Sequence, residues 1–187
     1  MNNFKAVITF TLVLFFLSNS NAQNSMLPST DEVKESKWKG FERLDFKIGG
    51  KSAWLIAPDK ALAGNPWIWR ARFPGWHTDA DSILVSEGFH LVHINTANQF
   101  GSPKAVKAWD EMYAHFTTKY NLNEKVALMG VSRGGLFVYN WAKSNPEKVS
   151  CIYGEAPVCD FKSWPMGKNG KRSDGDWNRL KEEYGFK

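Results

Sequence analysis

One short segment of the sequence combines a potential nucleophile with the glycines of a sharp turn. The segment Gly130-Val131-Ser132-Arg133-Gly134-Gly135 follows the predicted strand 125–129 and precedes the helix-forming run 136–142. A serine flanked in this way at a strand-to-helix turn adopts a strained backbone that lifts its hydroxyl off the sheet. Helix N-terminal N–H groups would also stabilise negative charge beside it. The pattern predicts that Ser132 is a nucleophile and that Gly130 and Gly134 shape its turn, with a helix-capping serine as the alternative.

A serine nucleophile needs an adjacent base, and the base needs a carboxylate that orients it. The chain contains four histidines, all of which precede Ser132: His77, His90, His93 and His115. The first falls in a loop and is the only one expected to approach the site, whereas the other three fall on or beside a strand or helix and suit core or surface roles. Asp160 closely follows the last predicted strand and is the candidate acid, with a solvated loop aspartate as the alternative.

The elements that must position these residues alternate between short β-rich runs and longer helical runs. We expect a hairpin from 41–48 and 52–57, strands at 66–71, 90–95, 125–129 and 149–153, and helices at 80–87, 103–120, 134–144 and near 176–184. The alternation from residue 66 onward predicts an α/β fold, a mostly parallel sheet with helices on both faces. Residues 23–37 are polar and aperiodic, so we expect a lead-in there and one domain over 38–187.

The N-terminus has the pattern of a secretory signal peptide. Lys5 is followed by the uncharged apolar run 6–17 and by Ser20 and Ala22 at the small-residue positions before a cleavage site. A membrane-spanning helix is disfavoured because the run has 12 residues, whereas a span needs roughly 20. We therefore expect removal of residues 1–22 and a secreted or periplasmic protein that does not bind a membrane.

Composition excludes several other classes of protein. The 187 residues are 43% hydrophobic, and the net charge of +5 is spread along the chain, so we do not expect nucleic acid as a partner. The sequence has neither a nucleotide-binding glycine pattern nor metal-ligand spacing, so no cofactor or metal is expected. Cys151 and Cys159 could pair outside the cytosol, but an extended segment would hold them too far apart, which favours two buried thiols.

These features together resemble the α/β-hydrolase superfamily, in its dienelactone-hydrolase and prolyl-oligopeptidase-like esterase branch. The resemblance covers about residues 38–160 and rests on three segments. They are the turn 130–135, the segment 67–75 where such enzymes have a strand and a loop often reading His-Gly-Phe-Pro-Gly, and the loop 95–102 with its Gly101-Ser102 pair.

The resemblance implies a role for each matching residue. Ser132 would attack the substrate, and the backbone N–H of Arg133 would be one donor of the oxyanion hole. The second donor would be the N–H of Phe73, with Arg72 as the neighbouring option, because Ala71-Arg72 replace the family's common His-Gly pair.

In this superfamily the acid and then the histidine follow the serine along the chain. Six strands are predicted where the superfamily core has eight, so we expect a fold that lacks the last two strands. The base and the usual acid would then lie beyond Lys187. A chain truncated in this way is expected to show little turnover.

The expected activity is hydrolysis of a carboxylic ester of a small molecule or a carbohydrate. Trp67, Trp69, Trp76 and Trp164 lie on or near segments around the site, where exposed aromatic faces can stack on sugars, although packing beneath helices is the alternative. Arg72 and Arg133 would suit a carboxylate in an acidic substrate. Two other functions stay open, a peptidase of the prolyl-oligopeptidase type and a non-catalytic binding module that keeps the turn without a base.

Overall fold

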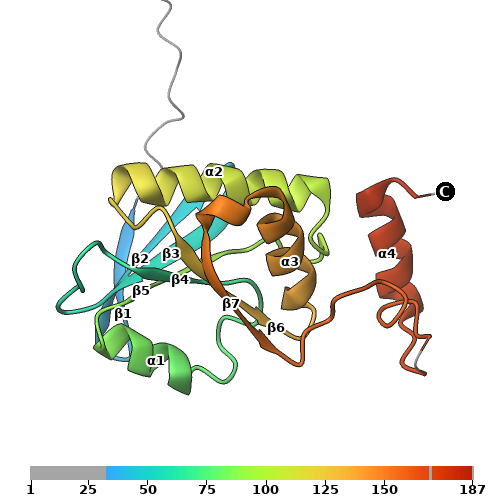
Figure 1. Ribbon diagram of the computed structural model, residues 1–187, viewed down its shortest axis with the longest axis horizontal. Coiled ribbons are helices and arrows are strands. Elements are labelled where there is room, and N and C mark those ends of the chain that lie inside the picture. The colour runs from blue at the N-terminus through green and yellow to red at the C-terminus, as the bar shows by residue number, and fades with distance from the viewer. Residues whose placement is uncertain (1–32, 169, 187) are drawn as a thin grey trace, which may run out of the picture.

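The computed structural model describes residues 33–168 and 170–186. The predicted signal peptide 1–22 lies outside the described residues. The elements, in chain order, are β1 (Lys34–Trp38), β2 (Phe41–Ile48), β3 (Lys51–Ala57), β4 (Trp67–Arg70), α1 (Asp79–Ser86), β5 (His90–Ile94), α2 (Pro103–Lys119), β6 (Val126–Val131), α3 (Gly134–Ser144), a 3-10 turn (Pro146–Lys148), β7 (Val149–Glu155) and α4 (Asp174–Tyr184) (Figure 1).

Within the described residues, seven strands form one sheet in the order β1-β2-β3-β5-β4-β6-β7. The pairs from β1 to β5 along this order are antiparallel, and the pairs β5-β4, β4-β6 and β6-β7 are parallel. This arrangement confirms the predicted α/β fold, with the hairpin adding antiparallel strands to a parallel half. The element boundaries agree with the sequence-based expectations to within a few residues.

Strand β1 is the main departure from the prediction. Its residues pair in register with β2 from Lys34↔Asp45 to Trp38↔Phe41, although 34–37 were expected to form part of a lead-in. The side chains of β1 are exposed or half-buried, so the strand lacks the apolar alternation by which strands are recognised in sequence. The prediction is wrong here because β1 is held by backbone pairing at the edge of the sheet.

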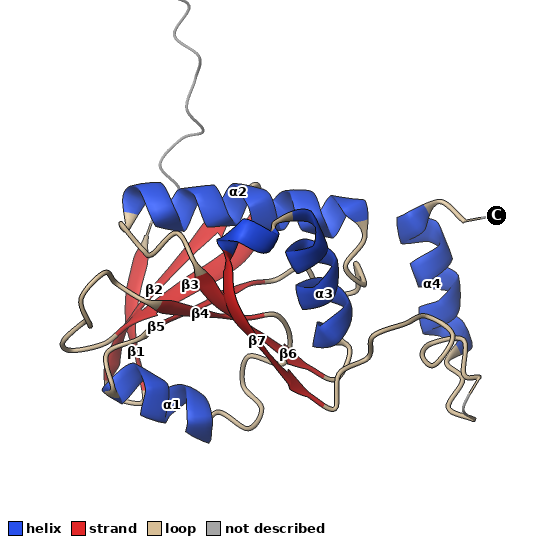
Figure 2. Ribbon diagram, viewed as in Figure 1, coloured by secondary structure: helices blue, strands red, loops and turns tan. Residues whose placement is uncertain are grey.

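Helices cover both faces of the sheet, as Figure 2 shows: α2 and α3 lie on one face and α1 on the other. On the first face Trp69 stacks on Trp109, with 4.2 Å between ring centroids, and contacts Trp141. Trp67 and Trp69 are 1% and 0% exposed, so they pack beneath these helices and are unavailable for stacking on a substrate. Aromatic rings in such numbers supply much of the apolar area that the core buries.

The C-terminal helix α4 packs against the start of α3 and the loop before α2. Leu180 is fully buried in a cluster with Phe100 and Leu136. The Tyr184 hydroxyl donates to the carbonyl of Phe100 (2.9 Å) and accepts from the Asn140 amide (2.9 Å). The segment after β7 therefore folds back over the carboxyl end of the sheet.

The strand order brings three loops together at that end. After β4 the chain moves to one side to form β5, and it then crosses over to place β6 on the other side of β4. Ligands of open α/β sheets bind at the carboxyl ends of strands where the order reverses in this way. The loops after β4, β6 and β7 meet there, and they carry Phe73, Ser132 and Asp160.

Candidate active site

Ser132 occupies a strained turn directly after β6. Its φ is +49°, in the left-handed region that residues other than glycine rarely adopt. Its N–H donates to the carbonyl of Glu155 (2.9 Å), and its own carbonyl accepts from the N–H groups of Val158 (2.8 Å) and Gly135 (3.0 Å). The turn is therefore held by two backbone bonds to the end of β7 and the loop after it and by one to α3, and Ser132 is exposed.

Glycines around this turn are required by close packing. A Cβ added to Gly130 would lie 2.7 Å from Val138 Cγ2, and one added to Gly135 would lie 2.5 Å from the carbonyl oxygen of Val158. A Cβ on Gly134 would lie 3.4 Å from Arg72 Cβ, which is a milder restriction. The sequence analysis singled out Gly130 and Gly134, whereas the structure shows that Gly135 is the more tightly enclosed of the two glycines that begin α3.

The predicted oxyanion donors follow neighbouring strands, because β4 pairs with β6. Phe73 has a φ of +53° in the loop after β4, and Arg133 caps the N-terminus of α3. Within the described part of the chain, the backbone N–H groups of Arg72, Phe73 and Arg133 donate to no other group. Of these three residues Arg133 lines the Ser132 pocket, and the role of all three in catalysis stays a prediction.

Arg70, which the sequence analysis did not single out, anchors the loop that carries Phe73. The side chain is 2% exposed, and its guanidinium forms an ion pair with the buried carboxylate of Asp81 in α1. It also donates from Nε to the carbonyl of Phe73 (3.0 Å) and from Nη2 to the carbonyl of Trp76. An arginine at the end of an otherwise apolar strand was the available sequence signal.

The histidines occupy different environments. His77 lies at the rim, with its side chain 62% exposed and its Nδ1 3.8 Å from Glu155 Oε1. His93 is buried behind the site and contacts the carbonyl of Arg70 through Nδ1 (2.8 Å), and burial lowers its pKa to about 4. His90 and His115 are half-buried, and burial lowers the pKa of each. None of the last three lines the Ser132 pocket.

Ser132 opens into a pocket of about 510 Å³ at the carboxyl end of the sheet. The loops after β6 and β7 and the start of α4 line it: Ser132, Arg133, Ala156, Pro157, Val158, Ser163, Trp164, Lys171 and Asp176. Among the described residues that line it, there is no histidine. The pocket therefore brings the nucleophile together with cationic and aromatic side chains and the Asp176 carboxylate, but not with a histidine.

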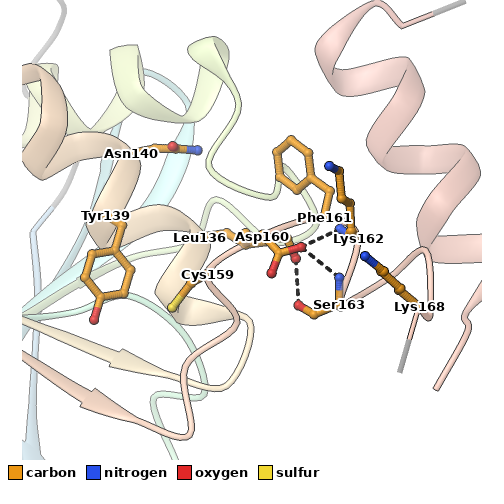
Figure 3. A pocket seen from close by; sticks show the side chains of 9 residues that line it. All are labelled: Leu136, Tyr139, Asn140, Cys159, Asp160, Phe161, Lys162, Ser163 and Lys168. Carbon is orange, nitrogen blue, oxygen red and sulfur yellow. Dashed lines mark hydrogen bonds between the residues drawn. The ribbon is translucent and has the colours of Figure 1, made fainter. Parts of the chain in front are cut away.

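Asp160 lines a neighbouring pocket of about 710 Å³ rather than that of Ser132. Its Oδ1 accepts from the backbone N–H groups of Ser163 and Lys162, each at 2.8 Å, so the carboxylate caps its own loop (Figure 3). The N–H of Ser163 is the main cause that lowers the pKa of Asp160. The structure brings no histidine to this carboxylate within the described residues, so its assignment as the catalytic acid gains no support.

The described residues also test the predictions for the cysteines, for metal ligands and for a membrane span. Cys151 and Cys159 are both free and exposed, so the prediction of unpaired thiols is confirmed and the prediction of their burial is wrong. In the part of the chain that the structure describes, no three potential metal ligands come together. A search of the same residues finds no helix with the length and apolar character of a membrane span.

Known structures share this fold at low sequence identity. A PEG-bound cold-adapted esterase from an Arctic intertidal metagenomic library superposes with a TM-score of 0.56 at 8% identity, covering 83% of this chain and 85% of that one. The native structure of the same esterase gives 0.52 at 10% identity, covering 65% of this chain and 61% of that one. Lipase A from Candida antarctica gives 0.52 at 11% identity, covering 71% of this chain and 42% of that one.

These similarities show the fold and not the activity of this chain. In the alignments to the native esterase and to lipase A, the chain spans 61% and 42% of the neighbour's length. No protein-family model matches the sequence, and no curated protein is similar to it. The α/β-hydrolase fold is thus shown, and the dienelactone-hydrolase and prolyl-oligopeptidase-like branch stays a prediction.

Proposed function

We propose that this chain carries the nucleophile of a secreted serine hydrolase that acts on carboxylic esters. The observation that carries the proposal is the strained turn of Ser132, with a φ of +49° at the carboxyl end of β6. Strain of this kind persists at functional sites because surrounding contacts hold it. Esterases and lipases among the structural neighbours support an ester as the substrate.

The chemical step follows from the position of the hydroxyl. Ser132 Oγ attacks the carbonyl carbon of the ester, the bond from that carbon to the alcohol oxygen breaks, and the alcohol leaves with the proton that the serine has lost. Water then attacks the acyl-serine, releases the carboxylic acid and returns a proton to Ser132. The N–H groups of Arg133 and Phe73 would stabilise the oxyanion in both steps, and the loss of one such donor typically slows a hydrolase by about 10²- to 10³-fold.

The proton transfer needs a base, and no histidine is among the described residues that line the Ser132 pocket. His77, which contacts Glu155 at the rim, is not among the residues that line this pocket. We therefore expect the 187-residue chain by itself to turn over esters very slowly.

Two tryptophans outside the buried core favour acylated carbohydrate as the substrate class. Trp164 lines the Ser132 pocket, and Trp76 in the loop after β4 is 47% exposed. Rings at such positions present apolar faces on which a sugar can stack. Trp76 and Trp164, rather than the buried strand tryptophans, are the residues that would contact a sugar.

A covalent probe tests the nucleophile directly. The chain is incubated with a fluorophosphonate, with and without added imidazole as a diffusible base, and the intact mass is measured. We expect one adduct per chain, located at Ser132, whose formation imidazole accelerates at least about tenfold because the base is supplied from solution. The Ser132→Ala variant should form no adduct, and Ser163→Ala, which changes another serine of the same pocket, should label normally.

A non-catalytic binding module is the second candidate, favoured by the lack of a histidine among the residues described around Ser132. Such a module would keep the turn as a scaffold, and its serine would react no faster than an exposed serine elsewhere. Labelling that imidazole does not accelerate, or labelling unaffected by Ser132→Ala, would decide for the binding module.

A further inference from the structure

Two arginines from different loops lie together beside the nucleophile. Arg72 comes from the loop after β4 and Arg133 follows Ser132, and the guanidinium carbons of both lie near the ring of Phe73, at 5.3 Å and 5.8 Å from its centroid. Burial, and next the charge of Arg133, lower the pKa of Arg72. Two like charges have thus been gathered at the mouth of the site, although their repulsion opposes this arrangement.

Among the described residues, the two cations share one nearby carboxylate, that of Asp176. Arg133 has one carboxylate within reach, Asp176 at 3.6 Å, and packs against the ring of Trp164 at 4.8 Å. The Nε of Arg72 is buried and, among the described residues, has no hydrogen-bond partner. Lys171 adds a third cation to the lining of the pocket. Buried donors of this kind are normally paired, so an acceptor from a ligand is the natural complement.

We propose that Arg72 and Arg133 form a carboxylate-binding subsite next to Ser132, and that the substrates are esters bearing a second, free carboxylate group. The planar guanidinium binds a carboxylate through two parallel hydrogen bonds, which fixes the orientation of the bound molecule. Ser132 and Arg133 line the same pocket, so one substrate can contact the serine hydroxyl and the guanidinium together. The ester part of this inference rests on the proposed function, whereas the subsite itself does not.

Equilibrium binding tests the subsite without any turnover. The probes are monomethyl glutarate, which carries one free carboxylate, and dimethyl glutarate, its neutral counterpart of nearly equal size. Affinities are measured by NMR titration of the Ser132→Ala chain at neutral pH and constant ionic strength. We expect the monoester to bind at least about tenfold more tightly than the diester, a difference of about 1.4 kcal/mol.

Variants locate the preference. Arg133→Gln and Arg72→Gln should each reduce the preference for the monoester at least about threefold, and they should leave the diester affinity nearly unchanged. Arg179→Gln, which removes the same charge from an exposed position on α4 outside the pocket lining, controls for net charge. A circular dichroism spectrum of each variant confirms that it folds. The comparison of the two probes in the chain without an arginine substitution does not depend on this check.

The outcomes separate this inference from the proposed function. Equal affinities for the two probes, or a preference that survives both arginine substitutions, would overturn the subsite even if Ser132 reacts with the fluorophosphonate. A preference that depends on both arginines, in a chain whose Ser132 does not react, would retain the carboxylate subsite and assign it to a binding module.

Discussion

Backbone strain marks individual residues around the pocket. Phe73, Ser132 and Ala156 have φ angles of +53°, +49° and +42°, and they follow β4, β6 and β7 respectively. Each such residue costs about 1–3 kcal/mol, which the surrounding structure must offset. For Ser132 the backbone bonds to Glu155 and Val158 hold the conformation. Among the described residues nine other than glycine have a positive φ, and these three of them lie where the loops after β4, β6 and β7 meet.

The glycine before the nucleophile gives a prediction at the residue scale. In Gly130→Ala the new methyl group would lie 2.7 Å from Val138 Cγ2 and 3.2 Å from Gly135 Cα, so we expect a loss of about 1–3 kcal/mol in the free energy of unfolding. Urea denaturation measures the change. Gly175→Ala is the matched control, because no heavy atom lies within 4 Å of that Cβ position in α4. It should be neutral or stabilising by up to about 1 kcal/mol, and equal effects of the two variants would contradict the packing explanation.

Among the elements, the loop after β4 is the one whose position depends on a buried ion pair. Arg70 links the carbonyls of Phe73 and Trp76 to Asp81 in α1. The helix that covers one face of the sheet thereby also fixes the loop that carries a predicted oxyanion donor. Asp81 Oδ1 has no hydrogen-bond partner among the described residues, so the pair contributes more to the geometry of the loop than to net stability.

Removal of the acidic partner tests this coupling between α1 and the loop. Asp81→Ala leaves the Arg70 charge buried and unpaired, so we expect a loss of about 3–5 kcal/mol in the free energy of unfolding. Guanidinium chloride denaturation measures it. On the same helix, Asp79→Ala should change stability little, because the Asp79 side chain is 97% exposed and its ion pair with Lys39 is screened by solvent. Similar losses for the two variants would show that α1 is sensitive to any change of charge.

The stability of the whole molecule should depend on pH through its buried histidines. Burial lowers the pKa of His93 to about 4 from an ordinary value of 6.5, and it lowers the pKa of His90 and His115 as well. Between pH 4 and pH 6.5 the imidazole of His93 binds a proton in the unfolded chain but not in the folded chain. This contribution to stability is therefore fully present above pH 6.5 and declines as the pH falls toward 4.

We expect His93 alone to account for a loss of about 2 kcal/mol between pH 7 and pH 5. Urea denaturation measures the free energy of unfolding of the parent chain and of His93→Gln at both pH values. The contribution of His93 is the difference between the two changes from pH 7 to pH 5. The variant should be less stable at pH 7 but should lose less stability on acidification. His77→Gln, which changes an exposed histidine at the rim, should retain the pH dependence of the parent chain. If the stability of His93→Gln depended on pH as strongly as that of the parent chain, another group would be the source of the pH sensitivity.

Features set by the spacing of neighbouring residues were predicted correctly, whereas features set by pairing across the fold were not. The helix from Gly134 to Ser144 and the turn at Ser132 were predicted correctly, because helical periodicity and glycine spacing are local properties. Strand β1 was missed, because its pairing with β2 leaves no apolar pattern in its own residues. Cys151 was expected to be buried, but β7 is an edge strand and the cysteine is exposed.

The sequence by itself determined the α/β alternation, the turn that presents Ser132 and the position of every histidine before it. Only the tertiary structure decided which loops meet. Arg72 and Arg133 lie 61 positions apart in the sequence, yet both contact the ring of Phe73. Asp160, close to β7 in sequence, instead caps its own loop. The reason is physical: local spacing selects the elements, whereas strand order and burial select the partners of each side chain across the fold.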